Sequence, residues 1–184
     1  MSKLETNTID TVSGTTNLVI GSTNTSTITM PNGALSGQNY PAFHASLSAT
    51  QTIADVTITK IEFDTELFDT DNCYDNTTNY RFTPTVAGKY FIYTHIDGDT
   101  TGTNKTDRVY LYLRKNGTDY SQNFVDFRNN PGKNMSVSTA VILDFNGSTD
   151  YVELWVYYES NQHTGVSEVS SSAGTFFGGY RIGA

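Results

Sequence analysis

Six carboxylates lie close together in the first half of the chain, between Glu62 and Asp75. Within this run, Asp69 and Asp71 are two residues apart and are followed by an asparagine, so they offer the oxygen ligands that calcium prefers. The glycine and the closing glutamate of an EF-hand loop are absent at the required offsets. The run therefore predicts either a calcium site at Asp69 and Asp71 or a solvated acidic loop.

The other residue types that support catalysis are few and scattered. His44, His95 and His163 lie on separate segments, and none has a neighbour at metal-ligand spacing. Cys73 is the single cysteine, and no Lys or Arg is near it in sequence to lower the pKa of its thiol. The sequence has no G-x-S-x-G, P-loop or H-E-x-x-H motif. We therefore expect no catalytic residues, structural or surface histidines, and a partly buried, inert thiol.

Two polar stretches, 98–106 and 159–174, are the candidates for ligand-binding loops. Loops at the end of a rigid β scaffold commonly carry binding residues. Both stretches contain few aromatic residues, so the alternative is that they are variable surface loops.

Alternating apolar and polar residues predict that these segments are positioned by about ten short strands, which is typical of a β-sandwich or jelly roll. Asn116-Gly117, directly after one of these strands, is a strong signal for a hairpin turn. The expected strands cover Ala42–Leu47, Val56–Glu66, Tyr80–Thr83, Lys89–Asp97, Asp107–Lys115, Tyr120–Arg128, Met135–Phe145, Tyr151–Tyr158 and Thr175–Ile182.

Two of the expected strands have apolar or aromatic residues on both faces. Tyr110 and Tyr112 alternate with Val and Leu residues, and Trp155 and Tyr157 do the same in a later strand. A strand of an isolated sandwich needs only one apolar face. The second, aromatic face predicts an oligomer interface, with exposed tyrosines on a solvated strand as the alternative.

The composition excludes several classes of protein. Thr, Asn and Ser make up one third of the 184 residues, and only 16% of the residues are charged. Helix formers are scarce, and no apolar run approaches the length of a membrane span. The net charge of −8 argues against binding to nucleic acids or anionic membranes. The N-terminal residues have no apolar leader, so we expect synthesis in a reducing cytosol.

The charge is distributed unevenly along the chain. No Asp, Glu, Lys or Arg occurs between Thr11 and Ala54, and this shift in composition predicts a boundary near Tyr40. Residues 1–40 would form an extended, β-rich arm for attachment or trimerisation, and 41–184 an acidic head. The strands expected in the arm are too short to build a core, so the arm is either a flexible linker or is ordered by partner chains. The apolar residues that would be buried by partners are Leu18, Ile20, Ile28 and Met30.

Residues 41–184 resemble the C1q-like domains of the C1q/TNF-like jelly-roll superfamily. The spacing of the aromatic, acidic and glycine residues carries the resemblance, although one gap is a residue longer than usual, and Ile92 and Thr94 replace two aromatic residues. The resemblance implies an all-β jelly-roll sandwich that forms a homotrimer, and some domains of this family bind calcium. The matching residues are Phe63, Asp69, Tyr74, Phe82, Gly88, Tyr90, Gly179 and Tyr180.

The arm is similar to segments that precede C1q-like domains in virion proteins of tailed bacteriophages. This implies a non-enzymatic virion structural protein, made in the host cytoplasm and located on the virion surface. It would be a short trimeric capsid-decoration or head-fibre protein, anchored to a phage capsid or tail protein by its arm. The alternatives are a receptor-binding tail fibre that recognises a host glycan or protein, and a carbohydrate-active enzyme with paired carboxylates in a groove. Apart from calcium, no cofactor is implied.

Overall fold

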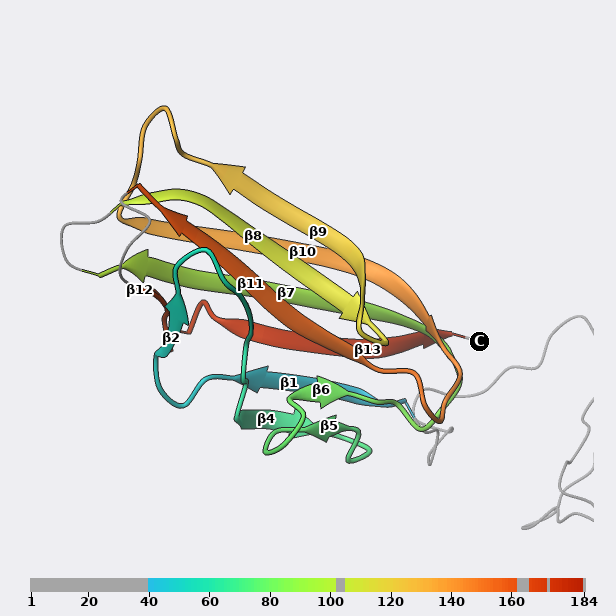
Figure 1. Cartoon of the computed structure of the whole chain (residues 1–184). Coiled ribbons are helices and arrows are strands. Elements are labelled where there is room, and N and C mark those ends of the chain that lie inside the picture. Colours follow the sequence, from blue (N-terminus) through green and yellow to red (C-terminus); the bar gives the residue numbers. More distant parts are fainter. Residues whose placement is uncertain (1–39, 102–104, 162–165, 172, 184) are drawn as a thin grey trace, which may run out of the picture. The chain divides into compact units, whose positions relative to one another are not determined.

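The computed structural model describes residues 40–101, 105–161, 166–171 and 173–183. These residues form two antiparallel sheets that pack face to face and contain no helix (Figure 1). One sheet has seven strands in the order β2-β12-β7-β13-β1-β4, with β10 also paired to β7. The other has six strands in the order β5-β6-β11-β8-β9, with β3 paired to β11. The prediction of an all-β jelly-roll sandwich is confirmed.

The strands vary in length from two residues to thirteen. Their bounds are β1 Ala42–Ser46, β2 Gln51–Ala54, β3 Ile58–Lys60, β4 Thr65–Asp69, β5 Tyr74–Asp75, β6 Arg81–Phe82, β7 Gly88–Thr100, β8 Thr106–Lys115, β9 Thr118–Asp126, β10 Asn134–Phe145, β11 Val152–Ser160, β12 Val166–Val169 and β13 Phe176–Gly183.

The core between the sheets is rich in aromatic rings. Phe43 of β1 stacks on Tyr74 and Phe82, with ring centroids 4.9 and 4.4 Å apart, and meets the edge of Phe177 at 5.0 Å. All four of these side chains are buried. Because side chains of a strand alternate between its two faces, the same strands expose a second set of residues on the outside of the sandwich.

The expected strand Val56–Glu66 is wrong as a single element. The chain forms β3 in the six-stranded sheet, crosses the core with Ile61 and Phe63 fully buried, and then forms β4 in the seven-stranded sheet. Apolar alternation continues through the crossover, because the side chains there still point into the core.

The loops are shorter than we expect from the polar stretches 98–106 and 159–174, because parts of both stretches are strands. β7 continues to Thr100, and β12 forms within the second stretch, where it pairs with β2 and β7. With four residues, and Val169 beside Ser167 on its buried side, β12 is too short and too polar to show a clear alternation in the sequence.

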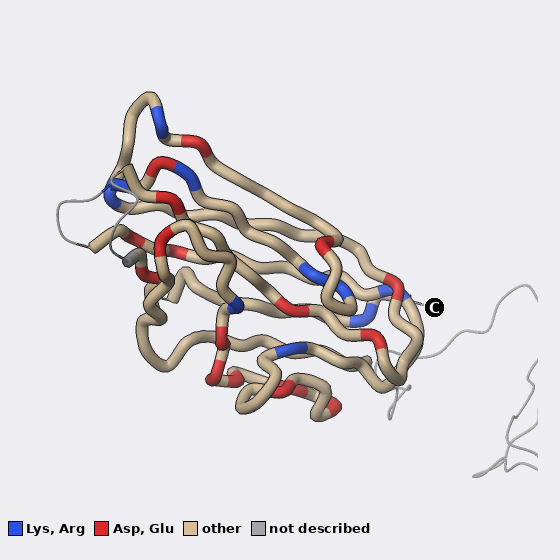
Figure 2. The backbone as a smooth tube through the Cα atoms, viewed as in Figure 1, with Lys and Arg blue, Asp and Glu red and all other residues tan. Residues whose placement is uncertain are grey.

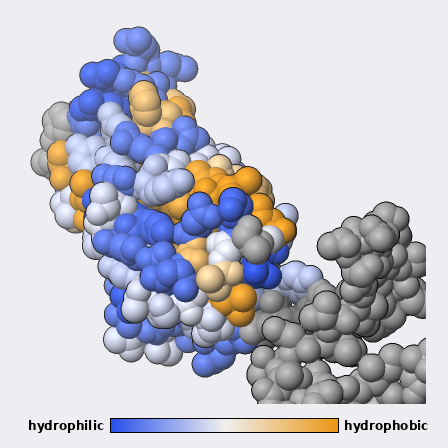
Figure 3. All heavy atoms as spheres, turned by 90° about the vertical axis from the view of Figure 1, so that its right-hand side faces the viewer, coloured by the Kyte–Doolittle hydropathy of each residue, from blue (hydrophilic) through white to orange (hydrophobic). Residues whose placement is uncertain are grey.

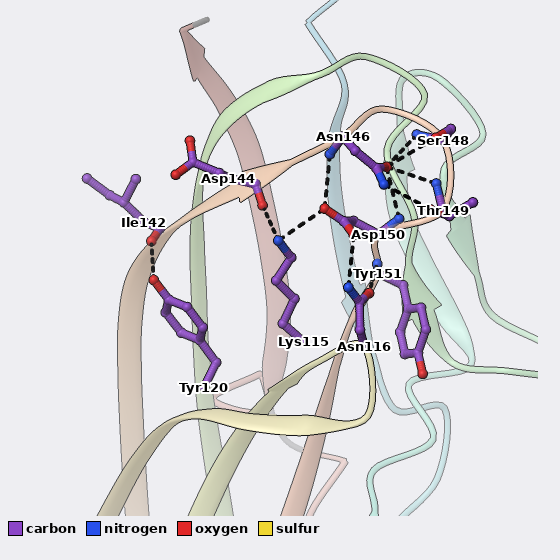
Figure 4. A network of polar contacts seen from close by, with 10 residues as sticks. All are labelled: Lys115, Asn116, Tyr120, Ile142, Asp144, Asn146, Ser148, Thr149, Asp150 and Tyr151. Atoms are coloured by element: carbon purple, nitrogen blue, oxygen red, sulfur yellow. Dashed lines mark hydrogen bonds and ion pairs between the residues drawn. The ribbon is translucent and has the colours of Figure 1, made fainter.

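The hairpin turn at Asn116-Gly117 forms as predicted, with positive φ angles of 52° and 77° that favour these two residues. Asp150 fixes this turn to the loop that follows β10 (Figure 4). Its carboxylate accepts a hydrogen bond from Asn116 Nδ2 at 2.8 Å and pairs with Lys115 Nζ at 3.0 Å. The hydrogen bond from Asn116 stabilises the charged carboxylate and is the main reason that the pKa of Asp150 lies below its ordinary value. The turns at this end of the head are therefore tied together by polar side chains.

Leu18, Ile20, Ile28 and Met30, which we expect to mediate attachment, lie outside the described residues. The expected arm and its boundary with the head therefore stay predictions.

Candidate functional site

Most residues of the family motif lie in or beside the core. Phe82 meets Tyr90 edge-on at 5.7 Å, and the Tyr74 hydroxyl donates to the Phe63 carbonyl at 3.1 Å. Asp69 accepts a hydrogen bond from the Tyr74 backbone N–H at 2.7 Å. A side chain at Gly88 would collide with the carbonyl of Gly183, and Gly88 has a φ of 141°. These residues explain why the chain folds, and Tyr180 is the member of the motif with a largely exposed side chain.

The outer surface of the seven-stranded sheet carries a continuous group of rings, which we call the seven-stranded aromatic face. Cross-strand partners lie on the same face of a sheet, so the register places these side chains next to one another. Its members are Phe91 and Tyr93 of β7, Phe176 and Tyr180 of β13, and His44 of β1. Phe91 lies between Ile142 of β10 and Tyr180, whose ring centroid is 5.6 Å away.

Tyr93 and His44 occupy the middle of this face. The Tyr93 ring covers Gly178, where any side chain would overlap it, and its hydroxyl is 3.1 Å from His44 Nδ1. The His44 ring stacks on Phe176 at 5.3 Å. Burial among these rings lowers the pKa of His44 below its ordinary value of 6.5.

Charged groups lie towards the ends of this face. At one end, Lys89 pairs with Asp144 at 3.3 Å, and at the other His95 contacts Asp97 at 3.0 Å. A hollow of about 240 Å³ lies beside His44 and Phe176 and is also lined by Leu47 and Leu67. The end of the head that carries the C-terminal part of β13 shows a hydrophobic area among hydrophilic surroundings (Figure 3).

The six-stranded sheet has a second group of outward-facing rings, which we call the six-stranded aromatic face. It consists of Trp155 and Tyr157 of β11, Tyr110 and Tyr112 of β8, and Phe124 of β9. Tyr110 stacks on Phe124 at 5.2 Å and on Tyr112 at 6.1 Å, and Tyr157 meets it edge-on at 5.6 Å. The outward-facing tyrosines and tryptophan expected from the sequence are therefore brought together.

Ion pairs lie along both ends of this second face. At one end Lys60 pairs with Glu153, and Arg114 pairs with Asp119 at 2.5 Å. At the other end, Arg108 pairs with Glu159 and Arg128 with Asp126, and hydrogen bonds from Arg128 lower the pKa of Asp126 to about 2. Lys60 and Arg114 also lie 5.3 and 4.7 Å from the centroid of the Trp155 ring.

Acidic residues gather along the segment that contains β4 and β5 (Figure 2). The Asp69 carboxylate accepts hydrogen bonds from its own loop, and Asp71 accepts one from the Thr85 hydroxyl. Within the described part of the chain, no group of three His, Cys, Asp or Glu side chains is arranged to hold a metal. Calcium binding at Asp69 and Asp71 stays a prediction.

Cys73 lies buried beside this acidic loop, at the edge of a hollow of about 480 Å³. Burial raises the pKa of its thiol to about 11, so the thiolate needed for nucleophilic chemistry is scarce at neutral pH. His44 and His95 are parts of the outer surface of the seven-stranded sheet, and His163 lies outside the described residues.

Sequence reasoning identified the six-stranded aromatic face but missed the seven-stranded one. Phe91, Tyr93 and His95 alternate with buried residues in the same manner as Tyr110 and Tyr112. That alternation was the available signal. The rings form a continuous surface only because β13, far away in sequence, pairs with β7, and β1 pairs with β13.

Comparisons with known proteins agree with this architecture. Residues 42–182 match the profile of a family described as the C1q domain. A crystal structure of murine APRIL at pH 5.0 is similar with a TM-score of 0.58 at 11% identity, covering 78% of this chain and 100% of that one. The Eiger TNF structure from S. frugiperda has a TM-score of 0.55 at 12% identity, covering 78% and 91% of the two chains. The globular domain of zebrafish complement 1qA has a TM-score of 0.52 at 19% identity, covering 77% and 97%.

No curated protein sequence matches the chain. In the described residues, no helix is long and apolar enough to cross a membrane.

Proposed function

This chain belongs to the C1q domain family, and we propose that it is a non-enzymatic structural protein whose head forms a homotrimer through the seven-stranded aromatic face. The observation that carries the proposal is the composition of that face. Its central rings, Phe91, Tyr93 and Phe176, have two histidines as neighbours: His44, whose pKa is lowered by burial, and His95, which stacks on Phe176 at 5.9 Å.

Burial of such a face costs little desolvation energy. Interface cores are enriched in aromatic residues and depleted of charged ones. The six-stranded aromatic face is less suited to this role, because four ion pairs border it and would have to be desolvated, whereas one Lys–Asp pair and one His–Asp pair border the seven-stranded face. C1q/TNF-like domains form homotrimers and are typically structural or ligand-binding modules, which supports the same assignment.

We further propose that the trimer is part of a phage virion, as a capsid-decoration or head-fibre protein with the head displayed outward. The support is the uncharged stretch before the head and its similarity to the segments that precede such domains in phage virion proteins. In this proposal, residues 1–40 attach the protein to a capsid or tail protein through Leu18, Ile20, Ile28 and Met30. The alternative role, a receptor-binding tail fibre, differs in the location of the protein on the particle.

The trimer is tested by the mass of the purified full chain in solution, measured for three proteins. We expect a trimer for the unchanged chain, a shift to monomer for Tyr93→Glu, and a trimer for Tyr110→Glu on the opposite sheet. Circular dichroism shows that each variant is folded. A monomeric unchanged chain, or a trimer that is lost in Tyr110→Glu and kept in Tyr93→Glu, would contradict the proposed interface.

Attachment is tested separately by deleting residues 1–40. The shortened protein should remain folded and lose its binding to particles, and electron microscopy with an antibody against the head should locate the full protein on capsid or tail. Undiminished binding of the shortened protein to particles would refute attachment through the arm.

A further inference from the structure

The six-stranded aromatic face offers a binding surface that self-association through the opposite sheet leaves uncovered. The two aromatic faces lie on opposite outer surfaces of one sandwich, so burial of one does not cover the other. We propose that the six-stranded aromatic face binds a neutral glycan built from pyranose rings. This inference does not depend on the trimer or on the virion assignment.

The first argument is the arrangement of the rings. The register aligns Trp155 with Tyr112, and Tyr157 with Tyr110 and then Phe124, so that two neighbouring rows of rings cross the sheet. Tyr110, Tyr112 and Phe124 are nearly parallel, with interplanar angles of 11° and 16°. Pyranose rings present flat faces of C–H groups, which pack against the apolar faces of aromatic rings. Phe124 is 54% exposed on β9, which has β8 as its partner in the sheet, and so its ring is accessible from the solvent.

The second argument is the balance of charge around the rings. Four cations and four carboxylates border the face, and each cation is paired with a carboxylate. A surface with paired charges has no excess of either sign to attract an ionic polymer or a charged peptide. Three of these groups, Asp119, Asp126 and Arg128, are 48%, 32% and 55% exposed, so they keep hydrogen-bonding positions towards solvent that suit the hydroxyl groups of a neutral sugar. This charge balance favours a neutral polyhydroxylated ligand over nucleic acid, acidic polysaccharide or basic peptide.

The third argument is the presence of donors near the rings without an acceptor. Among the described residues, Trp155 Nε1 and Arg108 Nε are buried donors with no hydrogen-bond partner. A buried donor left without a partner costs free energy, and an oxygen ligand that reaches it recovers part of that cost. The Lys60 and Arg114 side chains lie against the Trp155 ring, so a ligand has to displace them to reach its N–H.

The chain contains a built-in probe for this test, because Trp155 is its single tryptophan. The full-length protein is titrated with soluble neutral glycans (mannan, xyloglucan, laminarin, galactan and chitooligosaccharides) while tryptophan fluorescence is recorded. Retardation in gels that contain each polysaccharide gives an independent measurement, with alginate as the anionic comparison. We expect at least one neutral glycan to change the Trp155 emission and to bind equally well when NaCl is raised from about 50 mM to about 500 mM.

Two variants and a matched control locate the site. Tyr110→Ala and Phe124→Ala should each weaken binding by about tenfold in Kd. Tyr120→Ala removes another exposed aromatic side chain from the same strand as Phe124 and should bind as the unchanged protein does. Failure of every neutral glycan to bind would overturn the proposal, as would binding only to alginate with loss at high salt. A change of oligomeric mass in Tyr110→Ala or Phe124→Ala would identify the face as a protein interface instead.

Discussion

Phe43 allows a quantitative test of how the head is held together. Its side chain is fully buried, stacks between Tyr74 and Phe82, and meets the edge of Phe177. Replacement of a buried phenylalanine by alanine costs about 3–5 kcal/mol, and each aromatic pair adds about 0.5–1.5 kcal/mol beyond its buried area. Tyr74 and Phe82 belong to two strands of the six-stranded sheet, and Phe177 belongs to the seven-stranded sheet. Because the three rings are held by separate strands, they cannot all move into the vacated space. We therefore expect Phe43→Ala to lower the free energy of unfolding by about 4–5 kcal/mol.

For a domain of this size, such a loss corresponds to a fall in Tm of about 10–15 °C. The assay is thermal and urea unfolding followed by circular dichroism, with all variants at the same protein concentration because association also contributes to stability. Tyr120→Ala, on the surface, should change the free energy of unfolding by less than about 0.5 kcal/mol. A loss below about 1 kcal/mol in Phe43→Ala would refute the reasoning, because the three ring contacts would then contribute almost nothing.

Two further predictions concern titratable groups. Burial lowers the folded-state pKa of His44 below 6.5, so the folded head binds fewer protons there than the unfolded chain. The contribution of His44 to the free energy of unfolding is therefore fully present above pH 6.5 and is lost as the pH falls below that value. Unfolding at about pH 5 and about pH 8 should show this loss, and His44→Gln should reduce the difference; an unchanged difference would exclude His44 as its source. Because the pKa of Cys73 is raised to about 11, a thiol reagent at about pH 8 should modify Cys73 slowly in the folded protein and rapidly in urea. Equally rapid modification in both conditions would show that the thiol is exposed.

The strands that were predicted most accurately are long and have one buried face. Alternate side chains are buried over residues 109–113 of β8 and towards both ends of β10, and this period of two is visible in the sequence. The segment 56–66 was misread because Ile61 and Phe63 continue the same alternation while the chain passes from one sheet to the other. Periodicity reports which residues are buried, but it does not identify the sheet to which they belong.

The candidate sites were predictable only where their residues are close in sequence. Tyr110 and Tyr112 are two of the five rings of the six-stranded aromatic face and lie in one strand, and so the sequence revealed it. The seven-stranded aromatic face requires His44, Tyr93 and Phe176 to meet across three strands, with Gly178 leaving room for the Tyr93 ring. Such a surface depends on sheet order and register, which have no local signature in the chain.

The two aromatic faces have different charge environments, and this difference links the two proposals. The seven-stranded aromatic face has one Lys–Asp pair and one His–Asp pair at its ends and is less costly to bury against other copies. The six-stranded aromatic face is bordered by four ion pairs, and the exposed members of these pairs retain hydrogen-bonding positions towards solvent. A trimer that buries the first face would carry three copies of the second. Because linked sites raise overall avidity well above the affinity of each site, a weak glycan site on each head would be sufficient for firm attachment to a surface with repeated glycans. A monomeric Tyr93→Glu variant should then keep the affinity for a short soluble glycan and lose most of its retention on an immobilised polysaccharide.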